Sequence, residues 1–476
     1  MAVAPAEQRW HEEVDIGIVG AGGCGLAAAL AAAQAATQQA VRVTVWEKAA
    51  APGGTTALSA GLIVAAGTPQ QRAAGIFETG DDLLNDVRAR NGARSDPALT
   101  GQLCASAAAV VEWLSDASGL RLDLVNEPID PGHTRARLHA PASRSGKALI
   151  EALVRRLERR GVRVCLSSPV LHLWTDASGA VVGVRVKVPR KSPTNVRCHK
   201  LILATDGFAA NRELLTQHCG AAGALPYIGV ATSSGDALAW AADLGAATRD
   251  LDAYEPYATV AMGSNLLIPW AVVDSGAILV NQGGARFADE TRGPGALVAP
   301  LLAQPGRVAY EVLDARILQL VTAQDPHFGA VVVARALRRA GELEGLAKQF
   351  QIPAAVLART VHDYNAAVAG GGDPFGRRAF GAPLAPPFYG TRVGPALLQT
   401  LGGLAIDAQA RVIRADGTPI PHLYAGGGAA VGISGPGSDG YLIGTGLLCA
   451  LGWGKIAAEH AVQELLAGRT AEESGQ

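Results

Sequence analysis

A glycine-rich turn between a strand and a helix places the strongest constraint on how this chain can fold. Residues 16–19 form a short apolar run that is typical of a buried parallel strand. Gly20, Gly22 and Gly25 follow at G-x-G-x-x-G spacing, and the Ala- and Leu-rich segment 26–36 predicts a helix. In a dinucleotide-binding fold, the first glycine permits the tight turn. The second lets a diphosphate approach the backbone, and the third lets helix and strand pack closely.

An acidic residue at the end of the next predicted strand supports this interpretation. Residues 41–46 predict that strand, and Glu47 ends it 22 residues after Gly25, close to the spacing at which a carboxylate binds a ribose hydroxyl. The diphosphate is expected at the N-terminus of the first helix, where unpaired N–H groups favour an anion. The alternative is a glycine-rich turn in another kind of α/β protein.

The segment after Glu47 indicates which dinucleotide is bound. Lys48 is followed by Pro52-Gly53-Gly54-Thr55-Thr56-Ala57-Leu58-Ser59-Ala60-Gly61. An acid and then a Gly-Gly pair resembles FAD-dependent oxidoreductases with a glutathione-reductase-type Rossmann domain. The fuller run resembles one branch of these proteins, the superfamily of fumarate reductase, 3-ketosteroid dehydrogenase and tricarballylate dehydrogenase. This resemblance implies FAD, and the absence of His from residues 53–61 predicts that it is bound non-covalently.

Later motifs extend the resemblance over residues 14–465. Residues 201–211 resemble A-T-G-G-F-x-x-N, with Asp206 in place of the usual Gly. Residues 283–290 match G-x-R-F-x-[ND]-E, residues 400–407 match T-x-G-G-x-x-I-[DN], and residues 423–427 match L-Y-A-x-G. The resemblance implies that a closing helix points its N-terminus at the pyrimidine end of the flavin, where reduced flavin carries negative charge.

Carried over residue by residue, the resemblance implies a set of cofactor-binding positions. These are Gly20, Gly22, Gly23, Gly25, Glu47, Lys48, Gly53, Gly54, Thr55, Thr56, Ser59, Ala60, Gly61, Val170, Thr205, Asp206, Gly207, Gly426, Gly427, Thr445, Gly446 and Leu447.

The length of 476 residues fits two domains. We predict an α/β protein in which an α+β cap domain is inserted into the Rossmann-type FAD domain. The FAD domain comprises residues 1–219 and 385–476, and the cap comprises residues 220–384. The active site is expected where the two domains meet.

Composition excludes several partners. With 41 basic and 42 acidic residues, nothing indicates binding to nucleic acid or to an anionic membrane. The six cysteines are scattered, without a CxxC pair or a CxxCH haem-attachment site, which favours a reducing cytoplasm. Residues 1–14 lack the apolar region of a signal peptide, and no run of 18 apolar residues predicts a membrane span. Because the sequence has no haem-attachment site, electrons are expected to come from, or go to, a separate partner.

The superfamily moves a hydride between flavin N5 and the β-carbon of an activated C–C bond, while a side chain moves a proton at the α-carbon. Its fumarate reductases hold the substrate carboxylates with Arg and His. Here the corresponding positions are Tyr257, Gln399 and Tyr441, which are neutral hydrogen-bonding residues. Gly440-Tyr441-x-x-Gly444 also resembles the tyrosine motif of ketosteroid dehydrogenases. These substitutions favour a ketone over a dicarboxylate, although either tyrosine could simply pack in the core.

The proton carrier stays open. The superfamily places Arg or Tyr eight residues after the arginine of R-F-x-[ND]-E, and here that position is Pro294, which cannot transfer a proton. Arg292 could substitute, or Tyr257 or Tyr441 could serve. Arg286 and Glu290 are expected to form a structural pair.

Three functions compete. The leading hypothesis is an oxidoreductase that introduces or reduces a C=C bond next to the carbonyl of a cyclic or steroid-like ketone. The second is an enzyme of fumarate or tricarballylate type that uses Arg292, Arg135 and His133. The third, from another class, is a flavoprotein whose FAD is structural. The substrate, direction, electron partner and oligomeric state are not predicted.

Overall fold

A mixed β-sheet forms the centre of the larger lobe. The computed structural model describes residues 2–3, 8–36, 40–125 and 132–474. In this part of the chain the strands of the large sheet follow the order β1-β8-β9-β10-β2-β3-β7, and β20 pairs with β10 and β19. Their bounds are β1 Ala2–Val3, β2 Glu12–Val19, β3 Val43–Trp46, β7 Arg163–Cys165, β8 Val170–Thr175, β9 Val181–Val186, β10 Thr194–Leu203, β19 Arg411–Ile413 and β20 Pro419–Ala425.

The strand that ends at the glycine-rich turn, β2, lies between parallel neighbours, as the sequence predicts. β2 pairs in parallel with β3 and β10, and β10 pairs in parallel with β20. β8, β9 and the first half of β10 form an antiparallel meander. Carboxyl ends of parallel strands therefore meet at one edge of this sheet, which is where doubly wound folds bind their ligands.

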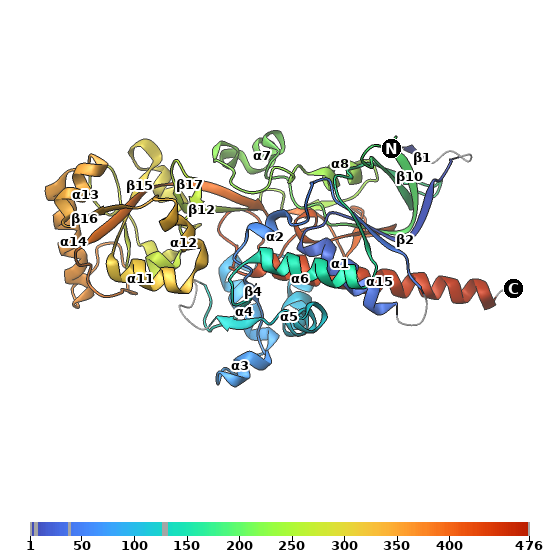
Figure 1. Cartoon of the computed structure of the whole chain (residues 1–476), viewed down its shortest axis with the longest axis horizontal. Coiled ribbons are helices and arrows are strands. Elements are labelled where there is room, and N and C mark those ends of the chain that lie inside the picture. Colours follow the sequence, from blue (N-terminus) through green and yellow to red (C-terminus); the bar gives the residue numbers. More distant parts are fainter. Residues whose placement is uncertain (1, 4–7, 37–39, 126–131, 475–476) are drawn as a thin grey trace.

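Helices cover the sheet on the side that Figure 1 shows below it. α1 packs against both α15 and α6, and α15 packs against α5. Small residues allow this close packing, because a Cβ atom on Gly454 of α15 would lie 2.5 Å from the carbonyl oxygen of Cys24 in α1. The helices of this lobe are α1 Gly23–Ala35, α2 Gly54–Leu58, α3 Pro69–Ala73, α4 Gly80–Asn91, α5 Pro97–Ser118, α6 Gly146–Arg159, α7 Arg212–Cys219, α8 Asp236–Ala242 and α15 Thr445–Ser474.

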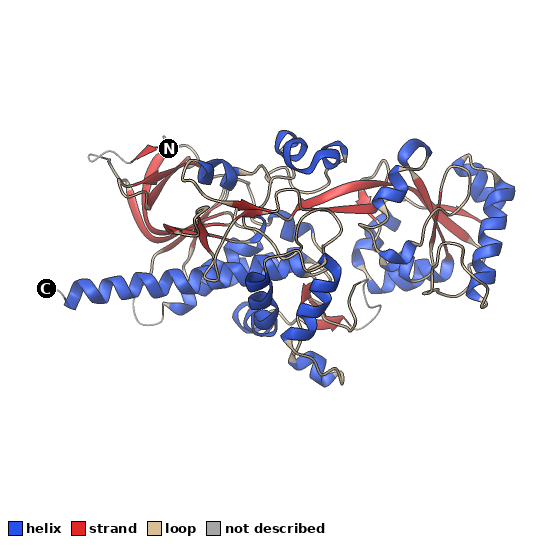
Figure 2. Cartoon of the chain, turned by 180° about the vertical axis from the view of Figure 1, so that it is seen from behind, coloured by secondary structure: helices blue, strands red, loops and turns tan. Residues whose placement is uncertain are grey.

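A second sheet organises the smaller lobe, at the left of Figure 1 and the right of Figure 2. Its strands follow the order β13-β12-β17-β15-β14, and β16 also pairs with β17. The strands are β12 Tyr254–Ala261, β13 Leu266–Leu267, β14 Ile278–Val280, β15 Ala309–Asp314, β16 Arg338–Ala340 and β17 Phe388–Thr400. Around them lie α9 Ala271–Asp274, η2 Glu290–Arg292, α10 Val298–Leu302, η3 Pro305–Arg307, α11 Ala315–Gln324, α12 Pro326–Val333, α13 Leu343–Phe350 and α14 Ala354–Val368.

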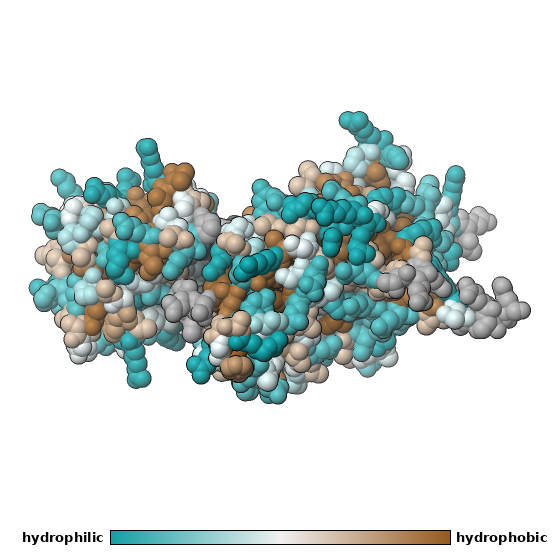
Figure 3. All heavy atoms as spheres, turned by 60° about the horizontal axis from the view of Figure 1, so that its bottom comes forward, coloured by the Kyte–Doolittle hydropathy of each residue, from teal (hydrophilic) through white to brown (hydrophobic). Residues whose placement is uncertain are grey.

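Smaller elements pack mainly against the core of the large lobe. β4, β5 and β6 form a small antiparallel sheet, and β11 pairs with β18. Their bounds are β4 Ile63–Val64, β5 Asp123–Val125, β6 Leu138–Ala140, β11 Thr248–Arg249 and β18 Gly403–Leu404, with the short helices η1 Gly220–Ala224 and η4 Gly427–Ala429. On the face drawn in Figure 3, hydrophilic residues spread over both lobes and apolar residues appear only in small patches.

The packing bears on the expected limits of the cap at residues 220 and 384. Ala237 and Ala241 of α8 pack into the core of the large lobe, although they follow residue 220. β17 begins after residue 384 and pairs with β12 and β15 of the second sheet. The core of the smaller lobe runs from Tyr257 to Ala396. We therefore propose domain limits nearer to residues 253 and 400 than to 220 and 384.

Candidate functional site

A cavity of about 570 Å³ lies where the two lobes meet. The large lobe contributes the carboxyl ends of β2, β3 and β10 and the beginnings of α1 and α15. The smaller lobe contributes β12, β13, α9 and the end of β17. Residues far apart in the sequence are thereby brought around one space, as expected for a ligand site between domains.

The three glycines of the first turn occupy different environments. Gly20 has a φ of +107°, and a Cβ atom there would lie 2.2 Å from the carbonyl oxygen of Ala204. A Cβ atom on Gly25 would lie 1.9 Å from the carbonyl oxygen of Gly20. The nearest atom to a Cβ on Gly22 would be the Gly53 oxygen, at 3.7 Å. Gly20 and Gly25 therefore serve packing, whereas Gly22 leaves space open toward the cavity.

Glu47 lies beside this turn and lines the cavity. Its two carboxylate oxygens accept hydrogen bonds from the backbone N–H groups of Ala21 and Ala49, each at 2.7 Å. Lys48 donates to Ser234 Oγ at 2.6 Å and to Asp236 Oδ2 at 2.8 Å, at the start of α8. These bonds fix the Glu47 carboxylate at the end of β3. The Lys48 bonds connect this end of the cavity to the start of α8.

The segment 53–61 packs directly on the glycine-rich turn. Thr56 Oγ1 accepts a hydrogen bond from the N–H of Gly23 at 3.2 Å, and the N–H of Gly53 donates to the Ala21 oxygen at 2.9 Å. Five predicted positions of this segment line the cavity, namely Gly54, Thr55, Thr56, Ser59 and Ala60. Gly53 and Gly61 are outside that lining and shape the loop through positive φ angles.

The second predicted motif packs directly against the first. Asp206 has a φ of +66°, a left-handed conformation that Gly adopts freely and Asp tolerates. Its Oδ2 accepts a hydrogen bond from Thr55 Oγ1 at 2.5 Å. Thr205, Asp206, Val170, Gly426 and Gly427 line the cavity. Gly207 lies behind them, where a Cβ atom would be 2.1 Å from Thr400 Oγ1.

These residues fit the FAD that the sequence predicts. Within the described residues, the buried hydroxyl of Thr205 has no hydrogen-bond partner, and it lines the cavity. The open space at Gly22 and the N-terminus of α1 face the same cavity. A buried hydroxyl without a partner and a helix N-terminus suit a polar, anionic ligand such as a diphosphate.

Tyr441, Gln399 and the beginning of α15 converge at the other end of the cavity. A Cβ atom on Gly446 would lie 3.1 Å from Tyr441 Oη and 3.2 Å from Gln399 Nε2. Gly446 and Leu447 line the cavity, while Thr445 is buried and donates from Oγ1 to the Leu442 oxygen at 2.6 Å. Burial raises the pKa of Tyr441 well above 10, and the charge of nearby Glu255 raises it further. The phenol is therefore a neutral donor at pH 7.

Glu255 is a site residue that the sequence analysis missed. It lines the cavity and accepts a hydrogen bond from Gln399 Nε2 at 2.6 Å, across the pairing of β12 with β17. Burial raises the pKa of Glu255 from 4.5 to about 7, and the Gln399 bond opposes part of that rise. The signal in the sequence was its position two residues before Tyr257, because alternate residues of a strand share a face.

Tyr257 lies on the same strand and lines the same cavity. Its ring packs edge-to-face on that of Trp270, with the ring centroids 6.2 Å apart. The structure therefore brings Tyr257, Tyr441 and Gln399 together, as expected from the sequence, and adds Glu255 and Trp270.

The cations of the carboxylate hypothesis lie elsewhere. Arg292 is exposed at the end of η2 and is not part of the cavity lining. The His133 ring is hydrogen-bonded to the Ile443 oxygen at 3.1 Å, and burial lowers its pKa to about 4. Arg135 is exposed and lines a separate surface groove with Glu78, Asp82 and Asp86. Residues 126–131, which precede His133 in the sequence, lie outside the described residues.

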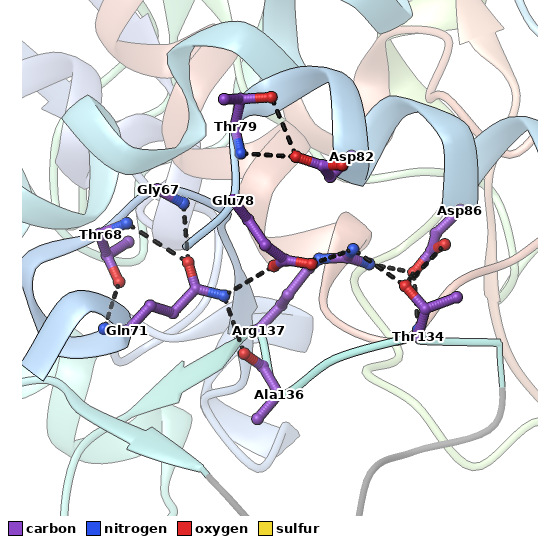
Figure 4. Close-up of polar contacts among 10 residues, drawn as sticks. All are labelled: Gly67, Thr68, Gln71, Glu78, Thr79, Asp82, Asp86, Thr134, Ala136 and Arg137. Atoms are coloured by element: carbon purple, nitrogen blue, oxygen red, sulfur yellow. Dashed lines mark hydrogen bonds and ion pairs between the residues drawn. The ribbon is translucent and has the colours of Figure 1, made fainter. Parts of the chain in front are cut away.

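A buried ion-pair network forms part of the wall of that groove (Figure 4). The Arg137 guanidinium binds Glu78 through Nε at 2.8 Å and Nη2 at 2.6 Å, and it also pairs with Asp86. Asp86 in turn accepts from the N–H and hydroxyl of Thr134. In the smaller lobe, Arg286 pairs with Glu290 at 2.6 Å, as predicted. Both networks consist of protein groups that satisfy one another, so we assign them to structure.

Among the described residues that line the main cavity, the lysines and arginines are Lys48 and Arg144. Lys48 is paired with Asp236, near the expected ribose position. Apolar and aromatic side chains dominate the wall from the smaller lobe, including Leu266, Leu267 and Trp270. This end of the cavity therefore suits an apolar ligand with a hydrogen-bonding group.

Sequence comparison gives matches over most of the chain. Residues 15–440 match the protein family described as FAD binding domain. The chain is 29% identical over 463 residues to a protein named fumarate reductase (cytochrome) from Shewanella frigidimarina, covering 95% of this chain and 78% of that relative.

Two solved structures are similar over nearly the whole chain. The open conformation of a flavocytochrome c3 fumarate reductase has a TM-score of 0.82 and 29% identity, and covers 96% of this chain and 79% of its own. The 3-ketosteroid-Δ4-(5α)-dehydrogenase of Rhodococcus jostii RHA1, in complex with 4-androstene-3,17-dione, has a TM-score of 0.75 and 26% identity, and covers 97% and 99%. Among the described residues, no helix is long and apolar enough to cross a membrane.

Proposed function

The chain belongs to the FAD binding domain family, and from that premise we propose that it interconverts a saturated and an α,β-unsaturated ketone, with a cyclic or steroid-like substrate. It is an FAD-dependent oxidoreductase that acts on carbon–carbon bonds, and its cofactor is FAD. A separate electron donor or acceptor is also part of the proposal, whereas the direction of the reaction is left unassigned.

One observation carries the choice of a ketone. Where carboxylate-binding cations are expected, the cavity presents the neutral groups of Tyr257, Gln399 and Tyr441, beside the wall formed by Leu266 and Trp270. A phenol can donate to a carbonyl oxygen without a charged partner. A dicarboxylate would instead need cations, because a buried carboxylate without a paired charge is strongly disfavoured.

Bound FAD supplies the exchange of a hydride at ring N5. The residues of this chain bind the substrate and stabilise the negative charge that develops on it during the reaction. Tyr441, with its phenol near the N-terminus of α15, is proposed to donate to the substrate carbonyl oxygen, where negative charge develops during the reaction. Trp270 and Leu266 exclude water from that space and orient an apolar ring.

A carboxylate substrate is the second candidate, because Arg144 lines the cavity and the fumarate reductases are similar over most of the chain. In this reading Arg144 binds the activating carboxylate in place of Arg292, Arg135 or His133. Arg144→Gln would then abolish turnover of fumarate.

Anaerobic mixing separates the candidates. The FAD-loaded enzyme is reduced with dithionite, and its reoxidation is followed by absorbance after adding 2-cyclohexen-1-one, 4-androstene-3,17-dione or fumarate. We expect rapid reoxidation by an enone and slow reoxidation by fumarate. The opposite order, together with a loss of fumarate turnover in Arg144→Gln, would establish the carboxylate reading. A flavin that no carbon acceptor reoxidises would favour a structural FAD.

A further inference from the structure

The proton carrier is the part of this reaction that the sequence leaves open. We propose that the Glu255 carboxyl group exchanges the proton at the substrate α-carbon. This inference rests on the proposed function, because it assumes a C=C bond activated by a neighbouring carbonyl. It assigns the role to a residue other than Arg292, Tyr257 and Tyr441.

The position of Glu255 is the first argument. The side chain lines the cavity between the two lobes and is bonded to Gln399, whose Nε2 also lies 3.2 Å from a Cβ position on Gly446 in the first turn of α15. Its charge also acts on the Tyr441 phenol. Glu255 therefore lies beside the proposed carbonyl-binding donor. Because the α-carbon of a ketone is directly bonded to the carbonyl carbon, a ketone bound to Tyr441 would have its α-carbon near Glu255.

The surroundings of Glu255 suit a proton carrier. Glu255 interacts with the neutral Gln399 amide and with the Tyr441 phenol, and the Cys449 thiol lies next to Tyr441. Burial raises the pKa of Cys449 to about 12, so both groups beyond Gln399 are neutral near pH 7. With a pKa of about 7, Glu255 is present in both forms at neutral pH, as efficient acid–base catalysis requires.

The reduction step balances as follows. The β-carbon receives a hydride from reduced FAD and forms a new C–H bond, while the electron pair of the C=C bond moves toward the carbonyl carbon. Tyr441 stabilises the oxygen that gains charge. The α-carbon then takes the proton of Glu255, which becomes a carboxylate and is reprotonated by water after the product leaves. The substrate gains the two electrons of the hydride, and the reduced flavin that loses them is left as oxidised FAD. Dehydrogenation is the reverse.

The test compares three variants as FAD-loaded, dithionite-reduced proteins. Glu255→Gln removes the proton and keeps the shape of the side chain, Arg292→Gln removes the rival carrier, and Glu344→Gln is the matched control on the exposed surface of α13. Reoxidation by 2-cyclohexen-1-one should slow by roughly 100- to 10,000-fold in Glu255→Gln and should not change in Glu344→Gln. Reoxidation by ferricyanide, which needs no proton on carbon, should be equal in all three.

The pH dependence gives a sharper readout. A protonated carboxyl is the active form for reduction, so the wild-type rate should fall as pH rises through about 7. Gln399→Leu removes a bond that stabilises the carboxylate, so the fall should move to higher pH. The oxidised wild type should also show a protonated-carboxyl infrared band that Glu255→Gln lacks and that disappears over the same pH range. The buried Glu311 carboxyl contributes equally to both proteins and cancels in their difference spectrum.

Three outcomes would overturn the assignment. One is reoxidation of Glu255→Gln by the enone at the wild-type rate, the second is a selective loss in Arg292→Gln, and the third is a carboxyl band that shows no change near pH 7. A wild type that uses fumarate and ignores enones would refute the ketone proposal alone. Glu255 would then be tested with fumarate as acceptor, by the same comparison of variants.

Discussion

Thr55 and Asp206 join the two halves of the cofactor site, with Thr55 Oγ1 2.5 Å from Asp206 Oδ2. Thr55 belongs to the segment after β3, and Asp206 follows β10, so the bond links two loops that both line the cavity. Asp206 also adopts a left-handed φ of +66°, which is strained for most residues but free for Gly. Asp206 therefore stands where the resembling motif has Gly, and its carboxylate adds a side-chain hydrogen bond between the two loops.

Two substitutions at Asp206 separate these effects. Asp206→Gly loses the hydrogen bond and relieves the strain, whereas Asp206→Ala loses the bond and keeps a strained φ angle. A hydrogen bond to a charged group contributes about 1.5–3 kcal/mol, and left-handed strain costs about 1–2 kcal/mol. We expect FAD to bind more weakly to both variants and most weakly to Asp206→Ala, by about 10- to 100-fold or more. Fluorescence titration of apoprotein with FAD measures this, and weaker binding by Asp206→Gly than by Asp206→Ala would contradict it.

The cofactor half of the site could be predicted because its determinants are local. The strand, the three glycines, the helix and Glu47 all fall within residues 16–47, and periodicity and spacing identify each of them. The structure places Gly20, Gly22 and Glu47 around one cavity, while Gly25 packs against the carbonyl oxygen of Gly20.

The catalytic half could not be predicted to the same depth, because its contacts are long-range. Glu255 meets Gln399 only through the pairing of β12 with β17, across 144 residues of sequence. Arg292 looked suitable from its distance to a motif, yet the turn in η2 leaves it exposed. The limits of the cap depended in the same way on the pairing of β17, which no local pattern reveals.

Arg137 gives a prediction about stability. Its side chain is 1% exposed, and it pairs with Glu78 and Asp86, whose side chains are 7% and 8% exposed. Arg137→Met leaves two buried carboxylates without their cation, which we expect to cost about 3–5 kcal/mol and to lower the melting temperature. The triple variant Arg137→Met, Glu78→Gln and Asp86→Asn removes every charge and should recover most of the loss. Calorimetry of the three proteins tests this, and equal melting temperatures for wild type and Arg137→Met would contradict it.

Glu311 on β15 predicts how stability depends on pH. The side chain is fully buried, and neither carboxylate oxygen has a hydrogen-bond partner among the described residues. Burial raises the pKa of Glu311 from 4.5 to about 8. Between these pH values the folded state binds more protons than the unfolded state, so raising the pH favours unfolding. The contribution of protonated Glu311 to the free energy of unfolding is fully present below pH 4.5. This contribution decreases as the pH rises and is lost above about pH 8.

Glu311→Gln removes this titration. We expect the variant to melt at a higher temperature than the wild type at pH 9. The corresponding gain in the free energy of unfolding is at most about 3–5 kcal/mol. Below pH 5 the two proteins should have similar stability. Melting curves across pH 5–9 measure the difference, with Glu344→Gln on the exposed surface as the control. Parallel pH profiles for wild type and Glu311→Gln would show that the carboxyl does not titrate in this way.

Tyr441→Phe tests the proposed carbonyl-binding group. Its phenol lies in the cavity beside Gln399 and Gly446, and its raised pKa keeps it a neutral donor. Removing one donor to a developing oxyanion typically costs about 100- to 1,000-fold in turnover. The variant should keep its fold and bind FAD but lose enone reduction by that factor, and Tyr257→Phe should show a similar or smaller loss. Single-turnover reoxidation measures both effects, with ferricyanide reporting on FAD. Wild-type rates in Tyr441→Phe with the best ketone would remove this residue from catalysis, because a side chain that only packs tolerates the loss of its hydroxyl.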